Sequence, residues 1–179
     1  MEFGFLPEGR LKSLKAKQFD TTYGSAVQML KQRLSGADFR SMAHDFPGAY
    51  AETTNGITVT VDPIFLDDES DPEAGMYFWA YHIIIENNGG DTVQLMSRYW
   101  RITNAMGALQ EVRGDGVVGE QPVLGPGEAF EYTSGTPLST SSGFMGGNYQ
   151  MVSRKGGQEF EITIPTFSLD SPYEGRSVN

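Results

Sequence analysis

The 179-residue sequence contains no cysteine. This absence excludes disulfides, zinc-thiolate sites, iron–sulfur clusters and thiol nucleophiles. A chain of this kind fits a reducing compartment, and we expect the protein in the cytoplasm. Histidine is also scarce, with only His44 and His82, so neither a paired-histidine metal site nor a histidine-based triad is expected. We therefore predict a non-enzymatic protein without a cofactor.

Long hydrophobic runs are missing as well. The chain does not open with a basic and then apolar leader, and no stretch approaches the roughly 20 apolar residues of a spanning helix. We expect no membrane span. The formal net charge is −10, distributed as seven Lys/Arg against five Asp/Glu in residues 1–49 and six against 18 in residues 50–179. An acidic body repels phosphate backbones, so we expect no nucleic-acid partner.

The first part of the chain follows a helical pattern. Asp20 is a suitable N-cap, Gly36 is a suitable C-terminal residue, and apolar side chains recur between them at helical spacing. This pattern predicts one helix near residues 22–35, within an N-terminal extension of residues 1–45. A lone helix of this length is marginal in water, so we expect the extension to be flexible when nothing binds it.

From Asn55 onward the two-residue alternation of β-strands replaces the helical pattern. Turn-forming residues such as Asn87-Asn88-Gly89-Gly90 separate the segments. We predict seven strands, at 57–61, 77–85, 92–103, 109–112, 130–132, 149–153 and 160–164. The fold class is all-β: a two-sheet antiparallel sandwich of the immunoglobulin or fibronectin type III kind, with a barrel as the alternative. The aromatic residues expected to fill its core are Trp79, Tyr81, Phe130, Tyr149 and Phe160.

Several sequence blocks occur in an order that resembles the ApaG family, over nearly all of residues 51–170. They include Tyr81-His82-Ile83-Ile84-Ile85-Glu86-Asn87, Leu95-Met96-Ser97-Arg98-Tyr99-Trp100 and Gly143-Phe144-Met145-Gly146-Gly147-Asn148-Tyr149. The resemblance implies a fibronectin-type domain over residues 50–179 that has no enzymatic activity. It also implies a link to cobalt tolerance and magnesium efflux, and related domains act as interaction modules. The resemblance does not extend to residues 1–45.

The segment Gly114-Asp115-Gly116-Val117-Val118-Gly119 has the glycine spacing of a dinucleotide-binding loop. That loop requires a following helix, whose N-terminus binds the phosphate. Here Pro122 and Gly125-Pro126-Gly127 follow instead. We favour a loop between strands, and keep Arg113, Gly114, Gly116 and Gly119 as a candidate ligand-binding set.

Five carboxylates occur between Asp67 and Glu73. Oxygen-rich clusters suit magnesium or calcium, but the spacing does not match an EF-hand loop. We favour a solvated acidic turn, with weak cation association at Asp67, Asp68 and Asp71 rather than a specific metal site.

Arg98 and Trp100 share one face of a predicted strand. Arginine and tryptophan are enriched at the energetic centres of protein interfaces, so these two residues are candidate interface residues. The competing interpretation places Trp100 in the core and pairs Arg98 with a carboxylate. The Gly/Ser-rich segment from Ser134 to Gly147, expected to be a long loop, is the other candidate surface.

The combined prediction is a binding or regulatory sandwich domain that contacts a protein partner, whose identity is unknown, in divalent cation homeostasis. The pathway comes from the family resemblance alone. The alternative is a protein that binds a nucleotide or polyphosphate at the loop from Gly114 to Gly119.

Overall fold

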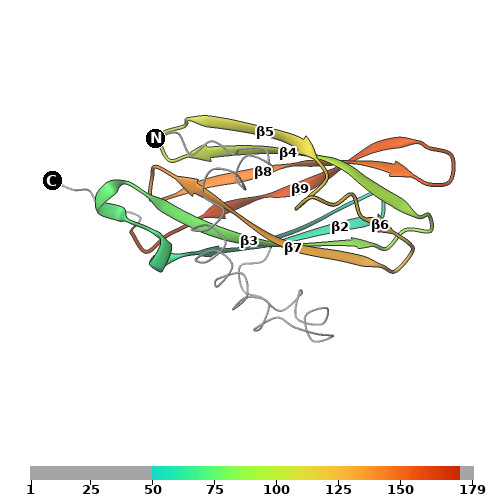
Figure 1. Cartoon of the computed structure of the whole chain (residues 1–179), viewed down its shortest axis with the longest axis horizontal. Coiled ribbons are helices and arrows are strands. Elements are labelled where there is room, and N and C mark those ends of the chain that lie inside the picture. The colour runs from blue at the N-terminus through green and yellow to red at the C-terminus, as the bar shows by residue number, and fades with distance from the viewer. Residues whose placement is uncertain (1–49, 174–179) are drawn as a thin grey trace.

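The structure is a computed structural model that describes residues 50–173. Nine strands and two short 3₁₀ turns make up this part of the chain (Figure 1). The elements are β1 (Tyr50–Thr54), β2 (Ile57–Phe65), η1 (Asp67–Glu69), η2 (Pro72–Ala74), β3 (Tyr77–Asn87), β4 (Val93–Asn104), β5 (Leu109–Asp115), β6 (Val123–Leu124), β7 (Ala129–Leu138), β8 (Gly143–Ser153) and β9 (Glu159–Leu169).

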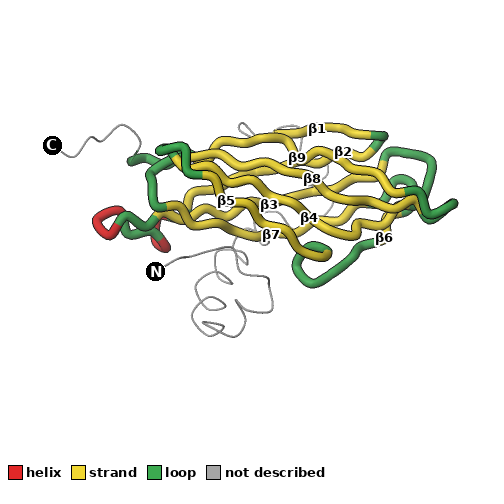
Figure 2. Tube along the Cα trace, turned by 90° about the horizontal axis from the view of Figure 1, so that it is seen from above, coloured by secondary structure: helices red, strands yellow, loops and turns green. Residues whose placement is uncertain are grey.

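The strands form two antiparallel sheets that pack face to face (Figure 2). The first sheet has the order β1-β2-β3-β7, and the second has the order β5-β4-β8-β9 with β6 paired to the start of β4. This architecture confirms the predicted two-sheet sandwich. The helix predicted at residues 22–35 lies outside the described residues.

A tight turn begins the first sheet. Thr54 pairs with Ile57, and the two residues between them, Asn55 and Gly56, have φ angles of 50° and 76°. Positive φ at both central positions is the geometry of a type I′ hairpin, for which Asn-Gly is the preferred sequence. The turn fixes the register of β1 on β2.

Side chains from β1 reach the free edge of β9. The backbone amide of Thr163 donates to the hydroxyl oxygen of Thr54 at 3.2 Å, and the amide of Ser168 donates to the hydroxyl oxygen of Tyr50 at 3.3 Å. These bonds join the two sheets along one side of the sandwich. The β5 strand forms an outer edge of the second sheet on the other side.

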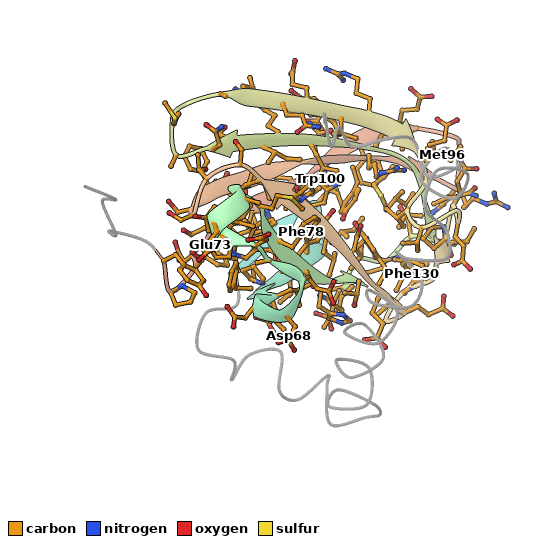
Figure 3. All side chains as sticks on the ribbon, turned by 60° about the vertical axis from the view of Figure 1, so that its left-hand side comes forward. Asp68, Glu73, Phe78, Met96, Trp100 and Phe130 are labelled. Atoms are coloured by element: carbon orange, nitrogen blue, oxygen red, sulfur yellow. The ribbon has the colours of Figure 1, made fainter. Side chains whose placement is uncertain are left out.

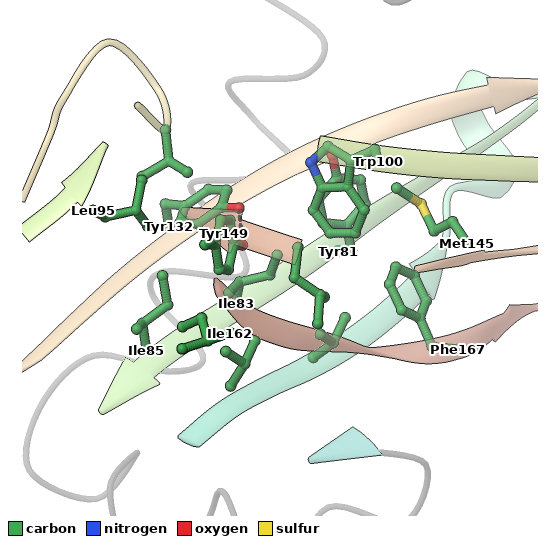
Figure 4. Packing of buried hydrophobic residues seen from close by; sticks show 14 of the residues in the cluster. Tyr81, Ile83, Ile85, Leu95, Trp100, Tyr132, Met145, Tyr149, Ile162 and Phe167 are labelled. Carbon is green, nitrogen blue, oxygen red and sulfur yellow. Dashed lines mark hydrogen bonds between the residues drawn. The ribbon is translucent and has the colours of Figure 1, made fainter. Parts of the chain in front are cut away.

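Aromatic side chains from both sheets fill the core (Figure 4). The Trp100 ring centroid lies 5.3 Å from that of Tyr81, 6.4 Å from that of Tyr149 and 6.2 Å from that of Phe167. Each of these four side chains is at most 1% exposed. Edge-to-face pairs of this kind add to the free energy of apolar burial, and they do so here in a chain without disulfides.

The predicted aromatic core is confirmed in most positions. Trp79, Tyr81 and Tyr149 are fully buried, whereas Phe130 and Phe160 are partly buried and pack against the core. Trp79 also donates its indole N–H to the carbonyl oxygen of Asp170 at 2.8 Å. This bond attaches the residue after β9 to the first sheet.

Two parts of the strand prediction are wrong. It omits β1 and β6, and it treats residues 134–147 as one long loop, although only 139–142 connect β7 and β8. The glycines that suggested a loop are required by close packing between strands. A Cβ at Gly143 would lie 2.4 Å from the carbonyl oxygen of Thr103, and one at Gly147 would lie 1.9 Å from that of Tyr99. Glycine therefore serves here to admit a neighbouring strand rather than to form a loop.

No helix in residues 50–173 is long and apolar enough to cross a membrane.

Candidate functional site

The outward face of the second sheet carries the candidate site. Tyr99 on β4 is in register with Arg113 on β5 and with Asn148 on β8. The neighbouring row places Ser97 between Asp115 and Gln150 in the same way. Side chains at paired positions of an antiparallel sheet share a face, and these line a groove of about 530 Å³, which Glu161 completes. We call this the polar groove.

A stacked pair lies in the middle of the polar groove. The guanidinium carbon of Arg113 lies 4.1 Å from the centroid of the Tyr99 ring, within cation–π distance. The Tyr99 hydroxyl donates a hydrogen bond to the carboxylate of Glu111. This bond to the neutral phenol raises the pKa of Tyr99. The three side chains hold one another in place on an exposed face.

The far wall of the groove is formed by amide and carboxylate side chains. Gln150 donates to the carboxylate of Glu161 at 2.8 Å. Charges of both signs therefore lie within the groove, with Arg113 on one wall and Asp115 and Glu161 on the others. Such a surface offers donors and acceptors to a partner without a single dominant charge.

An apolar patch continues the same face toward the other end of the sheet. Leu109 on β5 and Phe144 on β8 both pair with Thr103 on β4, one from each side. Leu109 is 49% exposed, Phe144 is 50% exposed, and Met106 in the adjoining hairpin is 86% exposed. We call these three residues the apolar patch. Exposed apolar side chains grouped on one face mark binding surfaces more often than singly scattered ones.

The two candidate interface residues, Arg98 and Trp100, lie inside the sandwich, which corrects the interpretation that they form a surface. Trp100 is 1% exposed and packs among core aromatics, and Arg98 is 8% exposed. Their inward direction follows from the bulge between Leu95 and Ser97, which sets the alternation of β4. Tyr99, between them, is the residue that faces outward, although no sequence pattern distinguishes it as a site residue.

The partner of Arg98 is a turn rather than a carboxylate. Its Nη1 donates to the carbonyl oxygen of Asp115 at 2.9 Å and to that of Gly116 at 2.8 Å. A Cβ at Gly114 would lie 3.0 Å from the same guanidinium. Gly114 therefore gives the Arg98 side chain room beneath β5.

The candidate ligand loop splits in the structure. Arg113 and Gly114 line the polar groove, whereas Gly116 and Gly119 belong to a tight turn beyond it. Val117 and Glu120 exchange backbone hydrogen bonds of 2.8 and 2.9 Å, and the amide of Gly116 donates to the carbonyl oxygen of Met96. These amides are committed to the protein backbone, so the turn lacks the row of inward-pointing donors that a phosphate loop needs.

The acidic segment forms η1, η2 and the residues around them, outside the packed sheets (Figure 3). Asp71 accepts a hydrogen bond from the amide of Ala74 as the N-cap of η2, and Asp67 accepts one from the hydroxyl of Tyr173. Asp68 lies in the first turn of η1. Among residues 50–173 no three His, Asp or Glu side chains converge in a way that could hold a metal ion. Asp71 therefore acts as a turn cap and Asp67 as a hydrogen-bond acceptor.

Comparisons with known proteins identify one family. The family model described as "ApaG domain" matches residues 67–153. A curated relative, Protein ApaG from Rhodospirillum centenum, is 62% identical over 128 residues, which is 72% of this chain and 97% of the relative. Protein ApaG from Parvibaculum lavamentivorans is 55% identical over 130 residues, covering 73% of this chain and 99% of the relative.

A solved structure shows the same fold. The crystal structure of the putative ApaA protein from Bordetella pertussis superposes with a TM-score of 0.63 at 44% sequence identity. The match covers 70% of this chain and 98% of the crystallised chain.

Proposed function

The chain belongs to the ApaG family, and from this premise we propose that it is a non-enzymatic regulatory protein that binds a protein partner through the outward face of its second sheet. The single observation that carries the proposal is the apolar patch, where Leu109 and Phe144 flank Thr103 in register. The same sheet face also exposes the stacked Tyr99 and Arg113, and aromatic and arginine side chains are the residue types enriched at protein interfaces.

The polar groove supports the same proposal. It continues the apolar patch along β4 and adds hydrogen-bonding groups, as the polar rim of an interface does. We propose that the domain covers residues 50–179 and follows an extension of residues 1–45. The family resemblance supplies the pathway, so the proposed partner acts in divalent cation homeostasis.

Affinity capture from extracts of the source organism tests this function, with the full chain as bait and quantification by mass spectrometry. We expect a partner that the wild-type chain retains and that Leu109→Ser/Phe144→Ser loses. The matched control is Val118→Ser/Val123→Ser, which removes two apolar side chains of similar exposure, 44% and 45%, away from the patch. A partner lost equally from both variants, or from neither, contradicts the proposed surface.

The cation pathway has a separate test. Cells in which Leu109→Ser/Phe144→Ser replaces the wild-type gene should lose cobalt tolerance, while cells with the control variant keep it. Normal cobalt tolerance in cells with a stable Leu109→Ser/Phe144→Ser protein would show that the apolar patch does not act in this pathway.

The nucleotide alternative retains one supporting observation, which is that Arg113 and Gly114 line the polar groove. Calorimetry with diadenosine tetraphosphate tests it. Micromolar binding that Arg113→Ala abolishes would replace the protein-binding proposal, whereas absence of heat favours the protein partner.

A further inference from the structure

The outer strands of the two sheets differ in how their edges are covered. Side chains of β1 hydrogen-bond to the backbone of β9, so these two edges face each other. The strand β7 contains Pro137, which has no N–H to donate to an added strand. Within residues 50–173, β5 pairs with β4 on one side and with no strand on the other (Figure 1). The free side of β5 is therefore the edge that offers its backbone to a further strand.

The direction of the backbone groups along β5 follows from its pairing with β4. The amide of Asn104 donates to the carbonyl oxygen of Ala108 at 3.1 Å, and the amide of Gly116 donates to that of Met96 at 2.8 Å. Hydrogen-bonded positions alternate along an antiparallel ladder, so the even-numbered residues of β5 direct their N–H and C=O groups toward β4. The odd-numbered residues in the middle of the strand consequently direct theirs toward the free edge.

Glu111 and Arg113 are the odd-numbered residues on either side of Val112, and both side chains are exposed. The Tyr99 hydroxyl donates a hydrogen bond to the carboxylate of Glu111, and the guanidinium of Arg113 stacks on the Tyr99 ring. Two opposite charges are thus held in place beside the free edge. Side chains that are already ordered lose less conformational entropy when a partner binds.

This charge pattern is complementary to itself. When two copies of β5 run antiparallel with Val112 opposite Val112, Glu111 of each copy lies opposite Arg113 of the other. Opposite charges at paired positions stabilise an antiparallel ladder, and like charges destabilise it. A two-fold axis at Glu111 or at Arg113 would instead place two like charges opposite each other. The charges therefore favour the register centred on Val112.

The same register matches the backbone groups. Glu111 and Arg113 both direct their N–H and C=O groups to the free edge, so each opposed pair exchanges two hydrogen bonds. A register shifted by one residue would oppose odd-numbered residues to even-numbered ones, whose groups point toward β4. Val112, at the centre, is 6% exposed and belongs to the core cluster of its own copy. Charge and hydrogen bonding thus favour one register independently.

We propose that a second copy of this chain binds the free edge of β5, in a symmetric dimer that pairs the two β5 strands antiparallel around Val112. The second sheets of the two copies form one continuous sheet. Their outward faces lie on the same side, because the two-fold axis is perpendicular to the sheet. Each dimer therefore presents two polar grooves and two apolar patches on one side.

The dimer is expected to be weak. A single strand pair buries less than the about 1,200 Å² of total area at which standard interfaces begin, so the dissociation constant should lie in the micromolar range. The inference goes beyond the proposed function and does not rest on it, because strand pairing through the backbone requires no ligand on the outward face.

Sedimentation equilibrium of the full chain, at micromolar to submillimolar concentrations, tests the dimer. We expect the wild type to follow a monomer–dimer equilibrium. Glu111→Arg sets two positive charges opposite each other at both symmetric positions, and Arg113→Glu sets two negative charges there. Each variant alone should therefore dimerise at least about tenfold more weakly than the wild type. A wild-type chain that stays monomeric over the whole range overturns the second copy as the occupant of this edge.

A mixture of the two variants tests the register. In a heterodimer, the two positive positions of the Glu111→Arg chain lie opposite the two negative positions of the Arg113→Glu chain. We expect the mixture to dimerise about as tightly as the wild type, and the exchanged chain Glu111→Arg/Arg113→Glu to pair with itself. Recovery requires both chains to be folded, so misfolding of a variant does not imitate it. Failure of both the mixture and the exchanged chain to dimerise contradicts the register.

Lys155→Glu and Glu159→Arg are matched controls. They change the net charge by the same amounts as the two β5 variants, at exposed positions around the β8–β9 connection. Both should dimerise like the wild type. Controls that weaken the dimer as much as the β5 variants would assign the effect to net charge and overturn the strand pairing.

Amide hydrogen exchange followed by NMR distinguishes strand pairing from any other dimer. The amides of Glu111 and Arg113 should exchange more slowly as the protein concentration rises, whereas that of Val112, directed toward β4, should not respond to concentration. A wild-type dimer that leaves the amides of Glu111 and Arg113 unprotected uses another surface and overturns the proposal.

Discussion

The guanidinium of Arg98 donates a hydrogen bond of 2.8 Å to the carbonyl oxygen of Gly116, 18 residues later in the chain. Arg98 is 8% exposed, so this charge has been transferred out of water. Its second acceptor is the carbonyl oxygen of Asp115 at 2.9 Å. The two bonds attach the end of β5 to β4, and they compensate for part of the desolvation of the charge.

Replacement of Arg98 should therefore destabilise the fold. Arg98→Met fills much of the same volume but leaves two carbonyl oxygens without their donor, and we expect a loss of about 3 kcal/mol in the free energy of unfolding. Urea denaturation followed by tryptophan fluorescence measures it. Arg101→Met, on an exposed side chain of the same strand, is the control and should change stability by less than about 0.5 kcal/mol. Equal effects from both variants would contradict the role of Arg98.

The turn at residues 116–119 provides a second prediction. Gly116 has a φ of 60°, and a Cβ there would lie 2.2 Å from the carbonyl oxygen of Glu120. Gly119 has a φ of 80°, but a Cβ there would meet no atom within 4 Å. Gly119→Ala should cost about 1–2 kcal/mol for backbone conformation alone, and Gly116→Ala should cost more because the clash adds to that term.

Thermal and urea unfolding of both variants check this order. Nucleotide affinity should not follow the same order as stability. The Gly116 amide already donates to the carbonyl oxygen of Met96, so it is not available to a phosphate. A Gly116→Ala protein with wild-type stability that had lost polyphosphate binding would restore the ligand-loop interpretation.

The sequence predicts most of the fold, because alternation of apolar residues is a local signal. Strands such as β2 and β3 repeat it over many residues, and Val59, Val61, Ile83 and Ile85 are core residues as the alternation requires. It fails at β8, where Gly146 and Gly147 interrupt the alternation and are needed for close approach of neighbouring strands.

The candidate site is less accessible to sequence reasoning. The direction of Arg98, Tyr99 and Trp100 depends on a bulge after Leu95, and a shift of one residue exchanges the two faces of a strand. The Tyr99–Arg113 pair depends on the register of β4 with β5. One signal was available, because the turn-forming residues Asn104-Ala105-Met106-Gly107 indicate a hairpin, and this hairpin brings Thr103 opposite Leu109.

A pair of buried phenols gives a third prediction, concerning alkaline pH. The hydroxyl groups of Tyr132 and Tyr149 lie 2.5 Å apart in a hydrogen bond inside the core. Burial is the largest cause that raises the pKa of each phenol well above its ordinary value of 10.0. The folded state therefore retains two protons that the unfolded state releases above pH 10. The contribution of these two phenols to stability is constant below that pH and falls as the pH rises further.

Spectrophotometric titration of phenolate absorbance checks this prediction. Tyr132 and Tyr149 should ionise only when the protein unfolds, so part of the phenolate absorbance should appear together with unfolding. Tyr132→Phe/Tyr149→Phe should flatten the decline of stability above pH 10. An unchanged decline in the double variant would assign the alkaline instability to other groups.

The exposed residues Leu109 and Phe144 provide the final prediction. If they bind a partner, their replacement should leave the free energy of unfolding almost unchanged, whereas if they support the fold, it should lower it. Both side chains are about half exposed on the outward face, and their replacement by serine removes little buried area. Leu109→Ser/Phe144→Ser should therefore change the free energy of unfolding by less than about 1 kcal/mol. Trp100→Ala, which empties a core position, should cost about 3–5 kcal/mol.

Denaturation curves measured beside partner capture distinguish the two roles. We expect Leu109→Ser/Phe144→Ser to lose the partner while it remains as stable as the wild type. A moderately destabilised core variant such as Ile102→Val should retain the partner at temperatures below its unfolding transition. The outcome that contradicts the binding role is partner affinity that falls in step with the free energy of unfolding across the wild type, Leu109→Ser/Phe144→Ser and Ile102→Val. The apolar patch would then contribute to the fold, because loss of a direct contact lowers affinity without lowering stability.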